Sequence, residues 1–160
     1  MHIDKCLTFL LGNGKTASGY TFDQLHKWSD DDWENHHDFI QWLFPLNEPS
    51  AHNPNGPVLN DEAYTTIKNT PNLLNAIRSN YDRFLSYAGV QRTDDGLEFK
   101  NYSKDFWEVP NHNWLRITRV LKSLNLCGLS DCSQEFWNFL QKLPIKGSTM
   151  AYWELAANPN

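Results

Sequence analysis

The chain has 160 residues, of which 40% are hydrophobic and 14% aromatic, so one domain can bury roughly two-thirds of its unfolded surface. A net charge of −5 and a pI near 5.6 exclude the strongly basic composition that is typical of general nucleic-acid-binding domains. The three cysteines show neither a CxxC spacing nor a disulfide framework, which favours a reducing compartment. No segment approaches the roughly 20 apolar residues that span a bilayer, so we expect a soluble, cytoplasmic protein with one domain over residues 1–160.

The first predicted element is a helix over residues 3–11, followed by the sequence GNGKT at residues 12–16. This sequence is similar to a phosphate-binding loop, but that motif needs a glycine five positions before Gly14, where Phe9 stands. The motif also needs a strand before the loop and a helix that starts at its Lys-Thr. We therefore expect Gly12 or Gly14 to end the first helix as its left-handed C-terminal cap.

Two N-terminal caps mark the next helices. Thr21 and Gln24 have the spacing of a capping box, and Ser29 precedes three aspartates that favour a helix N-terminus. Pro45 predicts the end of the second of these helices, because proline disfavours helical geometry in the residue before it. We therefore expect one continuous helix between Ser29 and Pro45.

A helical rotation of about 100° per residue divides the side chains of that helix between two faces. One face is apolar and includes His37, with His36 at its edge, whereas Gln41 and Trp42 fall among polar residues on the opposite face. One interpretation is that the histidines are core residues and Trp42 packs under a loop or another helix. The other is a binding cleft whose wall is lined by Trp42 and a histidine.

Glu34 and His37 have the Glu-x-x-His spacing of carboxylate-bridged di-iron sites. Such sites need a second Glu-x-x-His pair and two more glutamates, and the sequence has no second pair. The His-Glu-x-x-His pattern of zinc proteases and the Gly-x-Ser-x-Gly pattern of serine hydrolases are also absent. We therefore expect no metal and no cofactor, and we assign no catalytic residue.

A loop rich in Pro and Asn over residues 45–57 precedes the next two helices. Asn60 is expected to cap a short helix. Pro71 is expected at the first position of a longer helix, which Gly89 closes.

The remaining segments complete the predicted fold. Asp95-Gly96 predicts one small β-hairpin near residues 90–100. Three helices are expected after it, over residues 111–128, 130–143 and 149–157. The sum is an all-α, single compact domain of about seven or eight helices with one small hairpin.

The helix predicted over residues 111–128 presents apolar side chains to the core and polar side chains on another face. His112, Arg116 and Arg119 lie within about 60° of one another on that polar face. One interpretation is a solvated face whose arginines pair with acidic residues elsewhere. The other is a short strip that recognises a carboxylate, a phosphate or an acidic partner through its guanidinium groups.

Two signature segments, over residues 33–50 and 111–129, are long and unusual. Their sequences HHDFIQWLFPLNEPS and NHNWLRITRVLKSLNLCGL closely resemble those of the opioid growth factor receptor conserved domain family. The resemblance extends from about Gly19 to Leu129. It implies a receptor-type domain, since the animal members are described as nucleus-associated receptors for the peptide met-enkephalin. Those members carry long extensions with basic targeting segments, so this sequence resembles a stand-alone, bacterial-type version of the domain.

The matching segments supply the candidates for ligand binding, and the family supplies no catalytic residue. The candidates are His37, Gln41, Trp42, His112, Asn113, Arg116 and Arg119, and Pro45 matches as well. Three functions remain open. The first is a small helical binding module for a met-enkephalin-like peptide or a protein ligand. The second is an enzyme with a cleft formed by His37, His112, Asn113 and Arg116. The third is binding of nucleic acid or an anionic partner through His112, Arg116 and Arg119.

Overall fold

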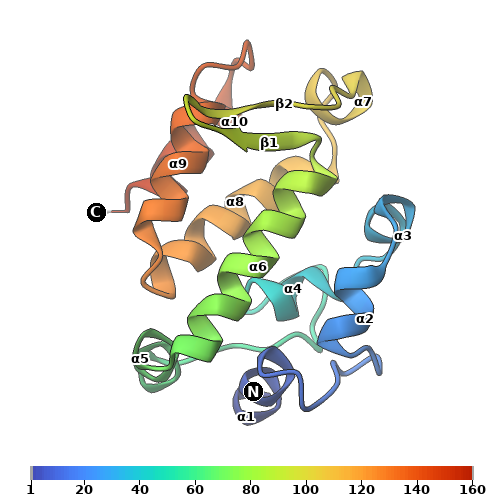
Figure 1. Cartoon of the computed structure of the whole chain (residues 1–160), viewed down its shortest axis with the longest axis vertical. Coiled ribbons are helices and arrows are strands. Elements are labelled where there is room, and N and C mark those ends of the chain that lie inside the picture. Colours follow the sequence, from blue (N-terminus) through green and yellow to red (C-terminus); the bar gives the residue numbers. More distant parts are fainter. Residues whose placement is uncertain (1, 160) are drawn as a thin grey trace.

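The computed structural model describes residues 2–159, which form ten helices and one two-stranded antiparallel sheet (Figure 1). In chain order the elements are α1 (Ile3–Leu10), α2 (Phe22–Lys27), α3 (Asp30–Asn35), α4 (Ile40–Leu43), α5 (Asp61–Asn69), α6 (Pro71–Tyr87), β1 (Val90–Thr93), β2 (Gly96–Phe99), α7 (Lys104–Trp107), α8 (His112–Leu126), α9 (Ser130–Leu140) and α10 (Ser148–Ala157). The predicted all-α class with one small hairpin is confirmed. More helices form than the seven or eight predicted, and two of them, α4 and α7, are single turns.

The GNGKT sequence ends a helix, as predicted. α1 stops at Leu10, and Gly12 adopts a φ of +83°, the left-handed conformation of a capping glycine. The amide of Gly12 donates to the carbonyl of Phe9 at 2.9 Å. The next helix, α2, begins only at Phe22, so the Lys-Thr pair does not start a helix as a phosphate loop requires.

Local hydrogen bonds fix the starts of the early helices. The hydroxyl of Thr21 accepts from the Gln24 amide at 3.1 Å, and the Gln24 side chain accepts from the Thr21 amide at 3.4 Å. This reciprocal pair is the predicted capping box. The Asn60 side chain likewise accepts from the amide of Ala63 at 2.9 Å and caps α5.

The single helix predicted over residues 29–45 is wrong, because the chain forms α3 and α4 with an extended connection between them. His36 ends α3 with φ −107° and ψ 142°. The carbonyls of Trp33 and His36 accept hydrogen bonds from Arg116, at 2.7 and 2.6 Å, so a tertiary contact outweighs local helix propensity. Because the helix is broken, the rotation of 100° per residue does not continue from α3 into α4. Trp42 is therefore fully buried instead of lying on a polar face.

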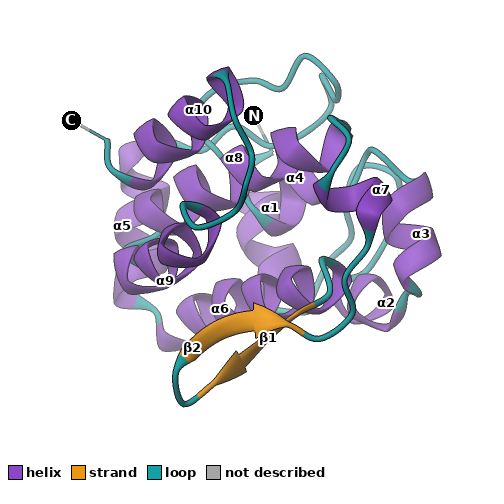
Figure 2. Cartoon of the chain, turned by 90° about the horizontal axis from the view of Figure 1, so that it is seen from above, coloured by secondary structure: helices purple, strands orange, loops and turns teal. Residues whose placement is uncertain are grey.

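The hairpin closes with Thr93 opposite Gly96, so its turn residues are Asp94 and Asp95. Gly96 then supplies the positive φ, +113°, at the first position of β2. β1 contacts α6, and β2 contacts α9. Figure 2 shows the hairpin beside α6 at one side of the molecule.

All ten described helices contribute buried side chains to one hydrophobic core. α8 packs against both α9 and α10, and its predicted apolar residues Ile117, Leu121 and Leu124 are fully buried. The tryptophans Trp33 and Trp153 are fully buried as well. Each such side chain stabilises the fold by about 1.5–3 kcal/mol or more, so these contacts hold α8 firmly in place.

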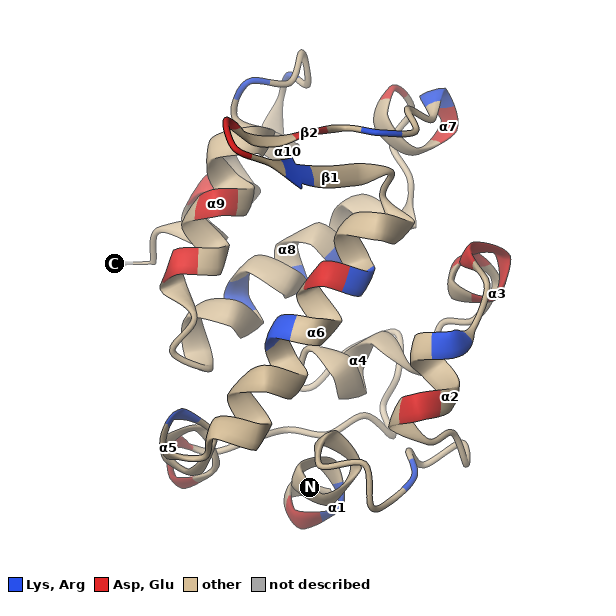
Figure 3. Cartoon of the chain, in the orientation of Figure 1, with Lys and Arg blue, Asp and Glu red and all other residues tan. Residues whose placement is uncertain are grey.

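Charged side chains of both signs are mixed along the helices. Asp82 lies between Arg78 and Arg83 on α6, and aspartates occupy the first turn of α3, where they complement the helix dipole (Figure 3). Within residues 2–159, every helix is too short or too polar to cross a membrane.

Candidate functional site

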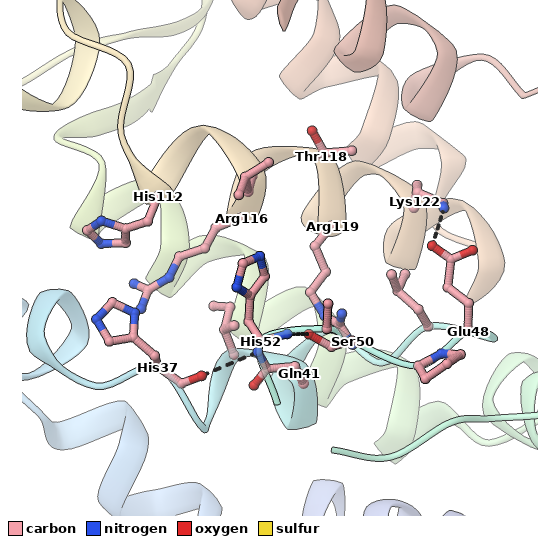
Figure 4. A pocket seen from close by; sticks show the side chains of 15 residues that line it. His37, Gln41, Glu48, Ser50, His52, His112, Arg116, Thr118, Arg119 and Lys122 are labelled. Carbon is pink, nitrogen blue, oxygen red and sulfur yellow. Dashed lines mark hydrogen bonds and ion pairs between the residues drawn. The ribbon is translucent and has the colours of Figure 1, made fainter. Parts of the chain in front are cut away.

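A cavity of about 420 Å³ lies where the two signature segments meet. Residues of α4 and of the loop over residues 46–52 line one side, and residues of α8 line the other (Figure 4). Five of the seven candidate ligand-binding residues line this cavity: His37, Gln41, His112, Arg116 and Arg119. The structure therefore brings together most of a set that the sequence divides between two distant segments.

Arg116 is buried and its guanidinium group is occupied by the protein itself. Its Nη1 donates to the carbonyl of Trp33 at 2.7 Å, and its Nη2 donates to the carbonyl of His36 at 2.6 Å. The guanidinium also lies over the rings of Phe39 and Tyr87, with centroid distances of 5.3 and 5.9 Å. Arg116 is 5% exposed, so neither a solvated face nor a free anion-binding fork describes it.

Glu34 lies behind the cavity wall, next to His112 and near Arg116. Nδ2 of Asn113 donates to Oε1 of Glu34 at 3.0 Å, and the hydroxyl of Tyr87 lies 2.9 Å from the same oxygen. Burial alone would raise the pKa of Glu34, but these hydrogen bonds and the nearby His112 and Arg116 outweigh it and lower the pKa. Asn113 is thus buried within a structural network instead of lining the cavity.

Two histidines stand together at one end of the cavity. The ring centroids of His37 and His112 are 5.1 Å apart, and the rings are nearly perpendicular. Nε2 of His112 lies 2.6 Å from Oε2 of Glu34, although the geometry does not align a hydrogen bond. Burial lowers the pKa of His112, and Arg116 and His37 lower it further, whereas Glu34 opposes the shift.

Arg119 differs from Arg116 in the use of its guanidinium group. Its Nε donates to the carbonyl of Phe44 at 2.8 Å. Within residues 2–159, Nη1 and Nη2 of Arg119 have no hydrogen-bond partner and no carboxylate within ion-pair distance. Burial lowers the pKa of Arg119 to about 10, so the group is still a cation at neutral pH.

Gln41 supports the loop that closes the cavity. Its side-chain oxygen accepts from Nδ2 of Asn53 at 3.1 Å, and the same Asn53 nitrogen donates to the carbonyl of Asp38 at 3.2 Å. A Cβ on Gly56 would lie 3.2 Å from the Cβ of Gln41, so the loop fits closely against this side chain. Gln41 therefore shapes the cavity wall while most of its polar atoms are already bonded.

Trp42 lies on the other side of α4, away from the cavity. It is fully buried and contacts α1, with its ring centroid 6.0 Å from that of Phe9. The cleft interpretation of Trp42 thus finds no support, and the packing interpretation describes its surroundings. Pro45 is structural as well, since its carbonyl accepts from the hydroxyls of Tyr64 and Ser123 at 3.2 and 2.9 Å.

A second hollow of about 880 Å³ adjoins the first. The two share Glu48, Thr118 and Lys122, and an ion pair of 2.9 Å joins Lys122 to Glu48 at this boundary. Tyr152 and Leu155 of α10 line the second hollow and are 63% and 58% exposed. The sequence reasoning missed these residues, although apolar side chains all around α10 were a signal that could have revealed them.

The cysteines and acidic groups offer no separate reactive centre. Burial raises the pKa of Cys127 to about 12 and of Cys132 to about 11, and it raises that of Cys6 further, so all three stay as thiols. Within the described part of the chain, no three His, Cys, Asp or Glu side chains are placed to hold a metal ion.

Comparison with known proteins gives consistent matches. The family model described as "Opioid growth factor receptor (OGFr) conserved region" matches residues 8–154. Human opioid growth factor receptor is 36% identical over 115 residues, which cover 67% of this chain and 17% of the human protein. The mouse receptor is 34% identical over 150 residues, which cover 84% of this chain and 24% of the mouse protein. Mouse opioid growth factor receptor-like protein 1 is 30% identical over 128 residues, covering 76% of this chain and 27% of that protein.

These relatives are much longer than the matched region, so this chain spans about a quarter of their length or less. No solved structure gives a significant match. The family model nevertheless covers most of the chain, including both segments that form the cavity. The chain therefore belongs to the opioid growth factor receptor conserved region family.

Proposed function

We propose that this domain is a binding module for a peptide or an extended protein segment. The observation that carries the proposal is the meeting of both signature segments at one cavity, which continues past Lys122 and Glu48 into a second hollow. The volumes of about 420 and 880 Å³ fall in the range of roughly 300–1,000 Å³ that is typical of ligand sites. Two adjoining hollows suit a ligand longer than a single small molecule.

The lining combines apolar contact with a few directional polar groups. Leu115 in the first hollow and Tyr152 and Leu155 in the second are exposed apolar side chains. Arg119 and Ser50 supply donors on the floor of the first hollow. Peptide ligands gain affinity from buried apolar side chains and specificity from such polar contacts.

The named relatives support a peptide as the first ligand to test. Several carry the name opioid growth factor receptor, and the resemblance implies met-enkephalin as their peptide. We therefore propose calorimetric titration of the purified domain with met-enkephalin beside a peptide of scrambled sequence. Saturable heat from the true peptide alone is the expected result, and heat from neither peptide would contradict a met-enkephalin-like ligand.

A matched pair of substitutions tests whether the ligand binds in the cavity. Leu115→Asp puts a charge into the cavity and should weaken binding at least about 10-fold, since a desolvated charge in a contact costs more than 1.4 kcal/mol. Val109→Asp is the control, because Val109 has a similar exposure but lies outside both hollows. Equal weakening by both variants would show that the cavity is not the binding site.

A second candidate function is acid–base catalysis by His112, which the short contact with Glu34 favours. His37, Arg116 and Asn113 lie near this pair, so the side chains of the enzyme hypothesis do converge. Hydrolysis of p-nitrophenyl acetate by the wild type and by His112→Asn tests it. A rate that is equal in both proteins would remove this candidate.

Binding of nucleic acid has the weakest support of the three functions. Of the three residues in the proposed strip, Arg116 bonds to backbone carbonyls and Arg119 lies within the cavity. Neither is placed for contact with a phosphate backbone. A cytoplasmic location stays a prediction, and fractionation of cells that produce the chain would test it.

A further inference from the structure

We propose that Arg119 is the anchor of a carboxylate-binding site on the floor of the first cavity. The carboxylate is assigned to the C-terminus of a peptide ligand, and in that respect the inference rests on the proposed function. None of the comparisons assigns this role to any residue of the chain.

The geometry of Arg119 leaves its bidentate edge open. The hydrogen bond from Nε to the carbonyl of Phe44, at 2.8 Å, fixes the orientation of the planar group. In the described part of the chain, the two terminal nitrogens have no protein partner, and the side chain lines the cavity. Figure 4 shows Arg119 extending from α8 toward the loop that carries Ser50. Two parallel N–H donors held in this way match the two oxygens of a carboxylate.

The charge of Arg119 is also uncompensated. Arg78, Arg83 and Arg92 each lie within 3.2 Å of a carboxylate oxygen, whereas Arg119 has no such neighbour within residues 2–159. Glu48, the carboxylate among the groups whose charges act on Arg119, is already paired with Lys122 at 2.9 Å. Arg119 is partly buried and has no paired carboxylate, so it favours a ligand that brings a negative charge into the same cavity.

A further donor lies in the same cavity. The Ser50 hydroxyl oxygen accepts from the amide of His52 at 3.2 Å, and its own hydrogen has no acceptor in the described part of the chain. Ser50 and Arg119 therefore both offer donors to a ligand in the first cavity.

These features favour a carboxylate over a phosphate. One open guanidinium supplies one positive charge, which balances a monoanion such as a carboxylate but only half of the charge of a dianion. The exposed apolar Leu115 lines the same cavity, so a group beside the carboxylate meets apolar surface. The C-terminus of a peptide with an apolar last residue has this combination of chemistry.

The test uses three probes on the wild-type domain: met-enkephalin, its C-terminal amide, and hexanoate. The free acid should bind about 10- to 100-fold more tightly than the amide, because the amide lacks the charge that pairs with Arg119. Hexanoate, a small carboxylate with an apolar tail, should raise the Tm of the wild type. Calorimetry and thermal unfolding provide the two measurements.

Two substitutions then test whether Arg119 causes the preference for the free acid and the rise in Tm. In Arg119→Gln the difference between acid and amide should disappear, and hexanoate should no longer raise the Tm. Arg78→Gln changes the net charge equally but lies outside the cavity, so it should keep both effects. Equal affinities of acid and amide for the wild type, or an unchanged ratio in Arg119→Gln, would overturn the proposal.

The outcomes separate the two proposals. If no peptide binds but hexanoate stabilises the wild type and not Arg119→Gln, the carboxylate site holds and the peptide function fails. If peptides bind without preference for the free acid, the peptide function holds and the carboxylate site fails. Should Arg119→Gln fail to fold, the NMR signal of the Arg119 Nε–H group in the wild type decides. A shift on addition of hexanoate supports the site, and an unmoved signal overturns it.

Discussion

Two arginines one turn apart on α8 have opposite relations to the rest of the protein. Arg116 donates to the carbonyls of Trp33 and His36 and belongs to a network with Glu34. Arg119 uses only Nε, on the carbonyl of Phe44. The comparison teaches that residue type and helical spacing do not distinguish an arginine that holds the fold together from one that is free to bind a ligand.

Removal of Arg116 should have the largest effect. Arg116→Met leaves one buried and one part-buried carbonyl without donors and Glu34 without its nearby cation, so we expect a loss of about 3–5 kcal/mol in the free energy of unfolding. Urea denaturation measures this loss. Arg78→Met, which removes an exposed ion pair, is the control and should cost less than about 1 kcal/mol. Similar losses in both variants would show that the carbonyl contacts of Arg116 contribute little.

Arg119→Gln should change stability much less than Arg116→Met. The variant loses one hydrogen bond to a carbonyl but also removes a partly buried charge that has no carboxylate partner, and the two effects offset each other. We expect a change within about 1 kcal/mol in the same urea experiment. A loss as large as that of Arg116→Met would mean that Arg119 is structural, and the contrast between the two would disappear.

Acid should weaken the Arg116 network through Glu34. Its pKa is lowered in the folded state, so its contribution to stability is complete above its ordinary value of 4.5 and is lost as the pH falls through the folded pKa. Glu34→Gln removes this contribution. The difference in unfolding free energy between wild type and variant should be largest above about pH 5 and shrink below it. Glu135 and Asp131, whose pKa values are also lowered, remain in both proteins, so their effects cancel. A difference that stays constant from pH 7 to 3 would contradict the assignment.

Much of the fold could be predicted because its signals are local. The capping box of Thr21 and Gln24 and the glycine after α1 act within a few residues, and both formed as expected. The apolar face of α8 follows from helical period, and Ile117 and Leu121 are buried accordingly. Such signals depend only on neighbouring residues, so they can be recognised without the tertiary structure.

The candidate site was less predictable, because its features come from tertiary contacts. The break between α3 and α4 coincides with hydrogen bonds from Arg116, which lies far along the chain. Trp42 is buried because α1 packs against it, which no helical projection of its own segment could show. The open edge of Arg119 likewise depends on where the carbonyl of Phe44 lies.

The bonds from α8 back to residues 33–44 have a consequence for the order of folding. They join positions that are 75 to 83 residues apart, about half the length of the chain. Contacts of such separation form late, since a long loop must close before they can be made. A growing chain that has not yet reached residue 111 therefore has no cavity, and a ligand that needs the cavity binds only the finished domain. Binding of this kind stabilises the native state by mass action and leaves incomplete chains untouched.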